Sequence, residues 1–147
     1  MPTLTPEWLS QHIVHKAPEA IIFADQQGVI RLWNEGATAI FGYSVEEAVG
    51  QNLDLIIPER HRGRHWEGYR RVMETGVTRY GAADLLAVPA LRKDGTRISL
   101  EFSIVLVRDE QDRLRGIAAI MRDVTKRWQQ ERERQARLAA LEAKSNK

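Results

Sequence analysis

The chain has 147 residues, of which 43% are hydrophobic, and its 22 basic and 20 acidic side chains give a formal net charge of +2. This length suits one domain of about 100–150 residues, and the charge is too small to indicate a nucleic-acid-binding protein. Because cysteine is absent, disulfides, thiolate metal sites, covalent c-type haem attachment and a flavin–cysteine photoadduct are excluded.

Neither membrane insertion nor secretion is indicated by the sequence. No apolar run approaches the roughly 20 residues that cross a bilayer, and the N-terminal residues 1–6 lack the charged-then-apolar layout of a signal peptide. We therefore expect a cytoplasmic protein with no membrane partner.

The first predicted element is a short helix over residues 1–16. Thr5 suits the N-cap, Pro6 the first helical position and Glu7 the first turn. We expect this helix to end at about Lys16 and to form a cap that precedes the main domain.

A hairpin and a short helix are predicted next. Ala20 to Asp25 and Val29 to Trp33 are β-rich stretches separated by the turn Gln26-Gln27-Gly28. Asn34 to Phe41 then reads as a short helix, which Gly42 can terminate.

Two further helices follow. Ser44-Val45-Glu46-Glu47 has the pattern of a capping box and starts a short helix that ends at Gly50. The longest internal helix is predicted from Glu59 to Thr75, between Pro58 and Gly76. Its apolar face is expected to comprise His65, Tyr69, Val72 and Met73.

The second half of the chain predicts three strands. Tyr80 to Leu91 is interrupted by Pro89, which indicates an edge strand, and Asp94-Gly95 suits a tight hairpin turn. Residues alternate between apolar and polar from Ile98 to Leu106, as in a half-buried antiparallel strand. Gly116 to Met121 is the last strand. This order of elements favours an α+β fold, with an antiparallel sheet and the helices grouped on one side.

A charged helical tail is predicted over residues 126–147, directly after Arg122-Asp123-Val124-Thr125. The tail has a 3.5-residue repeat, but only half of its seam is apolar, so a dimer helix with a poor seam and a solvated charged helix both remain open. The seam positions are Val124, Trp128, Glu131, Gln135, Leu138 and Glu142.

Four motifs in register resemble those of PAS sensory domains. They are Trp33-Asn34, Phe41-Gly42-Tyr43-Ser44, Arg92-Lys93-Asp94-Gly95-Thr96 and the Asp-x-Thr of residues 123–125. The resemblance covers residues 17–125. It implies a PAS fold, with a five-stranded antiparallel sheet, helices on one face, an N-terminal helix and a C-terminal signalling helix.

The stretch Ile57-Pro58 to His65 resembles haem-binding PAS sensors such as the rhizobial oxygen-sensing kinases. The resemblance implies that His65 would ligate the iron of a b-type haem for gas or redox sensing, because a neutral imidazole facing an apolar cavity can hold iron from one side. Tyr69 would flank it, and Arg70 or Arg71 could meet a haem propionate. The alternative is a histidine that packs or hydrogen-bonds without haem.

The other wall of the expected pocket departs from that family pattern. Leu86 stands where the rhizobial sensors carry an arginine that stabilises bound oxygen, and Asp84 stands where a related sensor has a methionine ligand. The matching wall would be Leu86, Phe102 and Ile104, which is apolar. We therefore expect a haem pocket here to suit CO or NO better than oxygen, with the iron five-coordinate as one possibility.

Other sites have weaker support. His61 and His65 are spaced to clip a metal on a helix, but no third ligand is visible nearby. Non-covalent flavin is not excluded, although residues 34–38 lack the cysteine of light-sensing members. The arginine-rich segment could bind phosphates, although a solvated helix face is the simpler reading. Its members are Arg60, Arg62, Arg64, Arg70 and Arg71.

Three classes of function remain to be compared. The first is a sensory module that binds a small ligand, homodimerises through its core and tails, and signals to a downstream effector. The second is a cofactor-free module for interaction or dimerisation. An enzyme is not expected, because the sequence shows no Gly-rich phosphate loop, nucleophile elbow or His-Glu-x-x-His motif.

Overall fold

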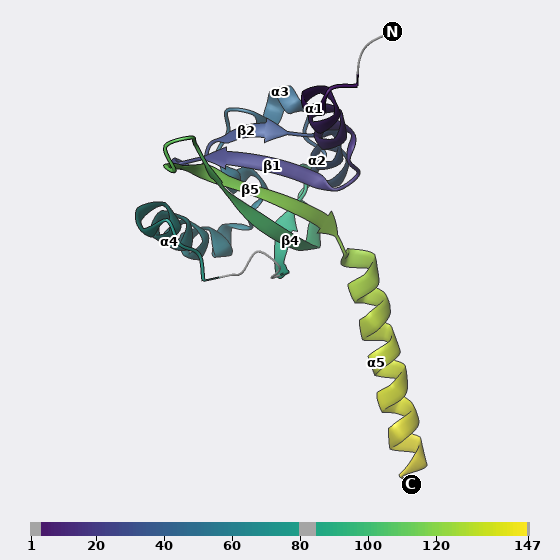
Figure 1. The fold of residues 1–147 in the computed structure, drawn as a ribbon. Helices are drawn as coiled ribbons and strands as arrows, with labels where there is room; N and C mark the ends of the chain where they lie inside the picture. The colour runs from purple at the N-terminus through teal and green to yellow at the C-terminus, as the bar shows by residue number, and fades with distance from the viewer. Residues whose placement is uncertain (1–3, 80–84, 147) are drawn as a thin grey trace.

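The computed structural model describes residues 4–79 and 85–146. Within these residues, five strands form one antiparallel sheet in the order β2-β1-β5-β4-β3 (Figure 1). The first and last strands in the sequence, β1 and β5, therefore lie side by side in the sheet. The strands are β1 (Ala20–Asp25), β2 (Ile30–Trp33), β3 (Leu86–Leu91), β4 (Arg97–Arg108) and β5 (Leu114–Asp123).

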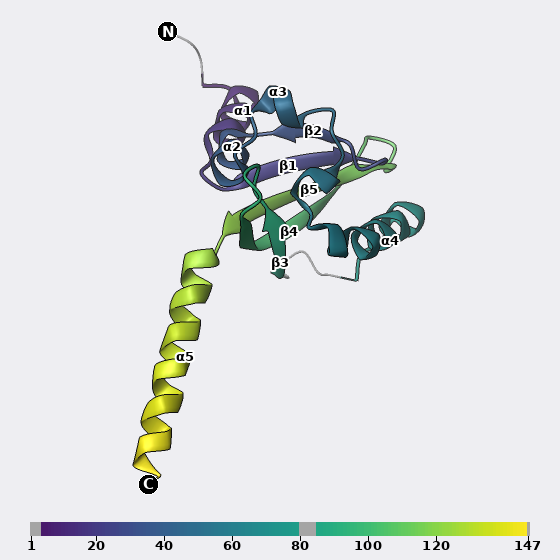
Figure 2. The same ribbon diagram turned by 180° about the vertical axis from the view of Figure 1, so that it is seen from behind.

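The helices differ in how closely they contact the sheet. Residues of α2, α3 and the 3-10 helix η1 share one core with the sheet, whereas α4 lies beside it and α5 extends away from the domain (Figure 2). The α+β fold with a single antiparallel sheet is thereby confirmed. The helices are α1 (Pro6–Lys16), α2 (Glu35–Phe41), α3 (Val45–Ala48), η1 (Leu53–Ile56), α4 (Glu59–Thr75) and α5 (Thr125–Ser145).

The core lies between the sheet and the three short helices. Its largest buried side chains include Ile22, Ile30, Phe41 and Leu100. Trp33 is also buried, and its indole N–H donates to Thr38 Oγ1 at 3.1 Å and to the Tyr43 carbonyl at 3.2 Å. Trp33 is therefore a packing residue of the core.

Asn34, only 1% exposed, is a buried polar junction between four segments. Its Oδ1 accepts from the backbone N–H of Ile21 (2.8 Å) and of Ala37 (2.9 Å), so it caps α2 and holds β1. Its Nδ2 donates to the carbonyls of Val14 (2.8 Å) in α1 and Glu19 (3.0 Å) in the α1–β1 link. One side chain thus meets the hydrogen-bonding needs of several buried backbone groups.

The Arg92–Thr96 turn connects the β3–β4 hairpin to the short helices. The backbone N–H of Lys93 donates to the Phe41 carbonyl at 2.8 Å, and Lys93 Nζ lies 2.5 Å from Glu47 Oε2. The hydrogen bond from Lys93 and the backbone N–H of Ser44 lower the pKa of Glu47 to about 2. Glu47 also completes the predicted capping box with Ser44. Gly95, at φ 86°, supplies the left-handed residue of the turn.

Most predicted boundaries lie near those of the structure, although β4 and β5 extend beyond their predicted ends. β3 begins at Leu86, and Tyr80 to Asp84 of the predicted strand lie outside the described residues. β2 begins at Ile30, because Val29 forms an isolated bridge with Asn52 instead. Pro89 lies in β3, which is an edge strand as predicted. No helix in the described ranges is long and apolar enough to span a membrane.

We expect Asn34→Ala to lower the free energy of unfolding by about 2–4 kcal/mol, because it removes a helix cap and leaves buried backbone groups unpaired. Urea unfolding followed by circular dichroism measures the change. Ser44→Ala is the control, since it removes the exposed cap of α3 and costs only about 1 kcal/mol. Equal costs for the two variants would contradict the central role of Asn34.

Candidate functional site

Helix α4 carries the predicted site and turns the predicted face towards the domain. Tyr69 is buried, and His65 and Met73 are half-buried, whereas Arg70 and Arg71 are exposed. Arg71 Nη2 lies 3.4 Å from Glu67 Oε1 on the solvent side of the helix. The structure therefore brings His65, Tyr69 and Met73 to one face and places the two arginines outside it.

Polar contacts to the backbone hold this helix in place. The Tyr69 hydroxyl lies 2.6 Å from the Asp25 carbonyl and 3.1 Å from the Ala24 carbonyl, at the end of β1. Burial and the nearby charge of Asp25 raise the pKa of Tyr69, so the phenol keeps the proton that it donates. Arg62 Nε donates to the Ile57 carbonyl at 3.0 Å.

Trp66 fixes the middle of α4 against the β1–β2 turn. Its indole N–H donates to Asp54 Oδ1 at 2.7 Å. Its ring covers Gly28 so closely that a Cβ on this glycine would lie 2.1 Å from Trp66 Cζ3. No local pattern of residues indicates these contacts, because Asp54 and Gly28 lie far from Trp66 along the chain.

His65 lies within this aromatic cluster. Its ring centroid is 4.7 Å from that of Trp66 and 5.7 Å from that of Tyr69. Burial lowers the pKa of His65, and the charge of Asp54 offsets this only in part, so the imidazole is neutral at neutral pH. Its Nδ1 is buried and has no hydrogen-bond partner among the described residues.

An orphaned nitrogen on a neutral imidazole fits a metal ligand, since the neutral ring is the form that coordinates. In the described part of the chain, no group of three or more His, Asp or Glu side chains is placed to hold a metal ion. The His61–His65 pair therefore gains no third protein ligand there. A haem would fit better, because its iron can be held by a single protein side chain.

The residues of the predicted wall lie on one face of β3 and β4. Leu86 pairs directly with Phe102, so their side chains share one face, and Ile104 lies on that face two residues further along β4. All three are half-buried, and Phe102 and Ile104 pack against the core. Asp84 lies outside the described residues.

An open groove of about 610 Å³ lies at the start of α4. It is lined by Pro58, Glu59, Arg60, Leu91 and Arg97. His65 is not among these residues, so this groove and the aromatic cluster are separate features of α4.

The joint between β5 and α5 is fastened to β4. The backbone N–H of Val124 donates to the Ser99 carbonyl at 2.9 Å, and the Ser99 N–H donates to Thr125 Oγ1 at 2.8 Å. Asp123 Oδ1 accepts from the Thr125 backbone N–H at 2.9 Å. The N-cap position is Val124, without a side-chain cap, so Asp123 acts through a local turn and not as the N-cap itself. Arg127 forms an ion pair with Glu101.

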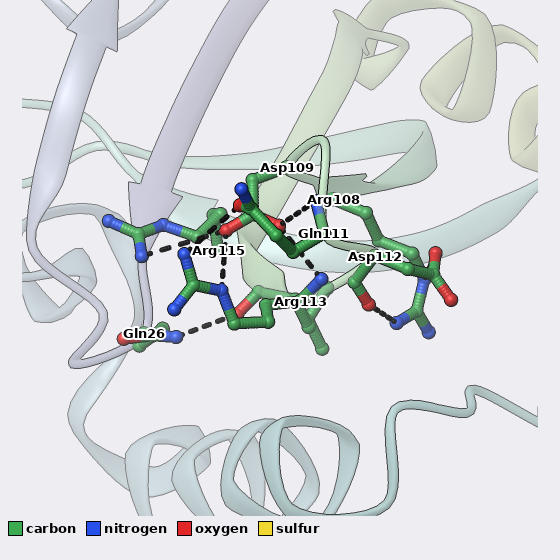
Figure 3. Close-up of polar contacts among 8 residues, drawn as sticks. Gln26, Arg108, Asp109, Gln111, Asp112, Arg113 and Arg115 are labelled. Carbon is green, nitrogen blue, oxygen red and sulfur yellow. Dashed lines mark hydrogen bonds and ion pairs between the residues drawn. The ribbon is translucent and has the colours of Figure 1, made fainter.

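At the opposite end of the sheet, polar contacts within the β4–β5 turn extend to Gln26 in the β1–β2 turn (Figure 3). Asp109 accepts from the backbone N–H of Arg113 at 2.9 Å and from its Nε at 3.0 Å, and these bonds lower the pKa of Asp109. Gln26 Nε2 donates to the Leu114 carbonyl at 2.7 Å. Arg108 Nη2 donates to the Gly76 carbonyl at 2.5 Å, so β4 also holds the C-terminal end of α4.

Comparison with known proteins is consistent with this architecture. A family model described as the PAS fold matches residues 14–129. The PAS domain of a protein from Colwellia psychrerythraea superposes with a TM-score of 0.72 at 24% identity, covering 83% of this chain and 99% of that one. At that level of identity, the likeness supports the fold.

Two curated sensors are similar in sequence. Sensor protein FixL of Bradyrhizobium diazoefficiens is 34% identical over 103 residues, which are 68% of this chain and 20% of FixL. Oxygen sensor protein DosP of Escherichia coli is 30% identical over 90 residues, which are 60% of this chain and 11% of DosP. The chain therefore spans a fifth or less of the length of these relatives.

We expect Thr125→Val to loosen α5 from β4, because the change keeps the side-chain size but removes the oxygen that pairs with Ser99. The free energy of unfolding should fall by about 1–2 kcal/mol, and hydrogen exchange at the Ser99 amide should accelerate. Thr75→Val, at the end of α4, is the control and should leave that amide protected. Unchanged protection of Ser99 in Thr125→Val would refute the fastening role.

Stability should also fall in acid through His65. Because the folded state holds the pKa of His65 below its ordinary value of 6.5, the unfolded chain binds the proton more readily. This contribution is intact above about pH 6.5 and is lost as the pH falls from there towards the folded pKa, by at most about 1.4 kcal/mol per pH unit. Urea unfolding at several pH values should show a shallower acid loss in His65→Leu than in the parent. Identical slopes would contradict the assignment.

Proposed function

Because the chain belongs to the PAS family, we propose that it is a sensory module that binds a small ligand, and that it is not an enzyme. We propose b-type haem as that ligand, held through His65. The observation that carries this proposal is the buried Nδ1 of His65, which lacks a partner among the described residues. The similarity to the oxygen sensor protein DosP points to the same class of function.

Several residues of the chain would hold the haem, each through a different contact. His65 would supply a neutral imidazole nitrogen to the iron, and Trp66 and Tyr69 would fix its ring by contact. Leu86, Phe102 and Ile104 would exclude water from the opposite wall. Arg70 and Arg71 are exposed, and we propose that one of them turns to pair with a propionate. When bound, the haem iron would supply a site for a diatomic gas or a redox change.

Strand β4 offers a direct route from the pocket to the tail. Phe102 and Ile104 line its inner face, while Ser99 and Glu101 on the same strand contact Thr125 and Arg127. A shift of β4 would therefore move the start of α5. A ligand can drive that shift only if it binds the two arrangements with different affinity. We propose that the output is a change in the packing of a homodimer, read by an effector.

A cofactor-free interaction module is the second candidate. It is favoured by the closed core around Phe41 and Leu100, which leaves these side chains fully buried. In that case His65 would serve only to pack the aromatic cluster. The outer face of the sheet and the tails would then be the functional surfaces.

Haem binding is tested by a visible spectrum. We expect the full chain, expressed with haem supplied or mixed with hemin, to show a Soret band that His65→Ala loses. His61→Ala is the matched control, since it removes a histidine one turn earlier on α4 and should keep the band. Circular dichroism verifies that both variants fold. A colourless parent that hemin does not reconstitute would rule out haem and leave the interaction module standing.

The same preparation tests the gas preference. Leu86, Phe102 and Ile104 carry no hydrogen-bond donor on their side chains, so the wall should favour CO or NO over oxygen. Gas titrations of the hemin-loaded chain measure the ratio of affinities. Tighter binding of oxygen than of CO would contradict the proposed wall.

A further inference from the structure

The open groove at the start of α4 is lined by charges of both signs. Glu59 and Arg60 come from the first turn of the helix, and Arg97 comes from the start of β4. Pro58 and Leu91 supply its apolar surface. Its volume of about 610 Å³ lies within the range of about 300–1,000 Å³ that is typical of small-molecule sites. The proposed haem site uses none of these residues.

The three charged side chains of the groove are exposed, and none of them forms an ion pair or a side-chain hydrogen bond within the described residues. Glu59 and Arg60 are adjacent in the chain, yet Glu59 pairs neither with Arg60 nor with Arg97. Opposite charges do meet nearby, since Lys93 Nζ lies 2.5 Å from Glu47 Oε2. The charges of the groove are therefore available to a ligand.

A third guanidinium follows the groove in the chain. Arg92 comes directly after Leu91, and its Nε is buried without a hydrogen-bond partner in the part of the chain that the structure describes. A buried donor without an acceptor costs free energy, and a charged one costs more. The positive charge at this end of the β3–β4 hairpin is thus not matched by ion pairs within the described chain, and it favours the approach of an anion.

The ligand that complements this groove carries two anionic groups and one cationic group. A guanidinium can bind a carboxylate through two parallel N–H donors, and the carboxylate of Glu59 can accept from an ammonium group. A few methylene groups between these charges would contact Pro58 and Leu91. An acidic amino acid has this combination, whereas a simple inorganic anion would meet repulsion from Glu59.

We propose that this groove binds an acidic amino acid. Arg60 and Arg97 hold its two carboxylates, and Glu59 holds its ammonium group. The site is separate from the candidate haem site, and it gives the domain a second input.

Strand β4 connects this site to the output joint. Arg97 begins β4, and Ser99 lies two residues further along on the same face of the sheet. Ser99 is hydrogen-bonded to Val124 and to Thr125. A ligand that fixes Arg97 would therefore steady the part of β4 to which α5 is fastened.

Isothermal titration calorimetry of the full chain with L-glutamate tests the proposal. We expect binding that Arg60→Gln and Arg97→Gln each weaken by at least about tenfold, because each removes a charge-assisted contact. Arg64→Gln is the matched control, since it removes the same charge one turn later on α4, outside the groove, and should bind as the parent does. Circular dichroism verifies that the variants fold.

Three related ligands, each lacking one charge, test the role of each side chain. Glutarate lacks the ammonium group, 4-aminobutyrate lacks the α-carboxylate, and L-glutamine lacks the charge of the side-chain carboxylate. Each should bind the parent more weakly than L-glutamate does. Glu59→Gln should abolish the preference for L-glutamate over glutarate, because the amide no longer attracts the ammonium group.

Absence of binding at about 10 mM L-glutamate, where even a site with a Kd of about 1 mM is largely filled, would overturn the proposal. So would an equal loss of affinity in Arg64→Gln, which would indicate a general effect of charge. A parent that binds glutarate as tightly as L-glutamate would refute the assignment of an amino acid. His65→Ala should bind L-glutamate as the parent does, so failure of the haem proposal would leave this one standing.

Discussion

The arrangement of the domain depends on the hydrogen bonds of one buried amide. Asn34 joins α1, the α1–β1 link, β1 and α2. These segments pack so closely that a larger residue does not fit at position 36. Gly36, two residues on, lies so close to this link that a Cβ would sit 2.1 Å from the Glu19 carbonyl. Because Asn34 caps α2 and also binds β1, this junction sets where α2 begins relative to the sheet.

Helix α4 is held on a different principle. Hydrogen bonds from Arg62, Trp66 and Tyr69 hold it, the Trp66 ring packs on Gly28, and Arg108 holds its C-terminal end. The helix that carries His65 is thus positioned by polar contacts together with the packing of its aromatic rings.

Sequence was a good guide wherever the cause of structure is local. The caps at Thr5 and Ser44 and the turn at Gly95 follow from residue types at fixed spacing, and the helix from Glu59 to Thr75 was predicted to the residue. In the candidate site, the face with His65 and Tyr69 follows from helical periodicity. The packing of Trp66 on Gly28 could not be predicted, because contacts between distant segments leave no periodic signal. The role of Ser99 at the joint was hidden for the same reason.

The strand order has one further consequence. Ala20, where the chain enters the sheet, pairs with Met121, near where the chain leaves it. Entry and exit are therefore neighbours, with a helix attached to each. A domain of this shape can be spliced between two helices of a host protein without stretching or rerouting the host backbone. The same geometry makes the domain suitable for insertion into a longer helix by protein engineering.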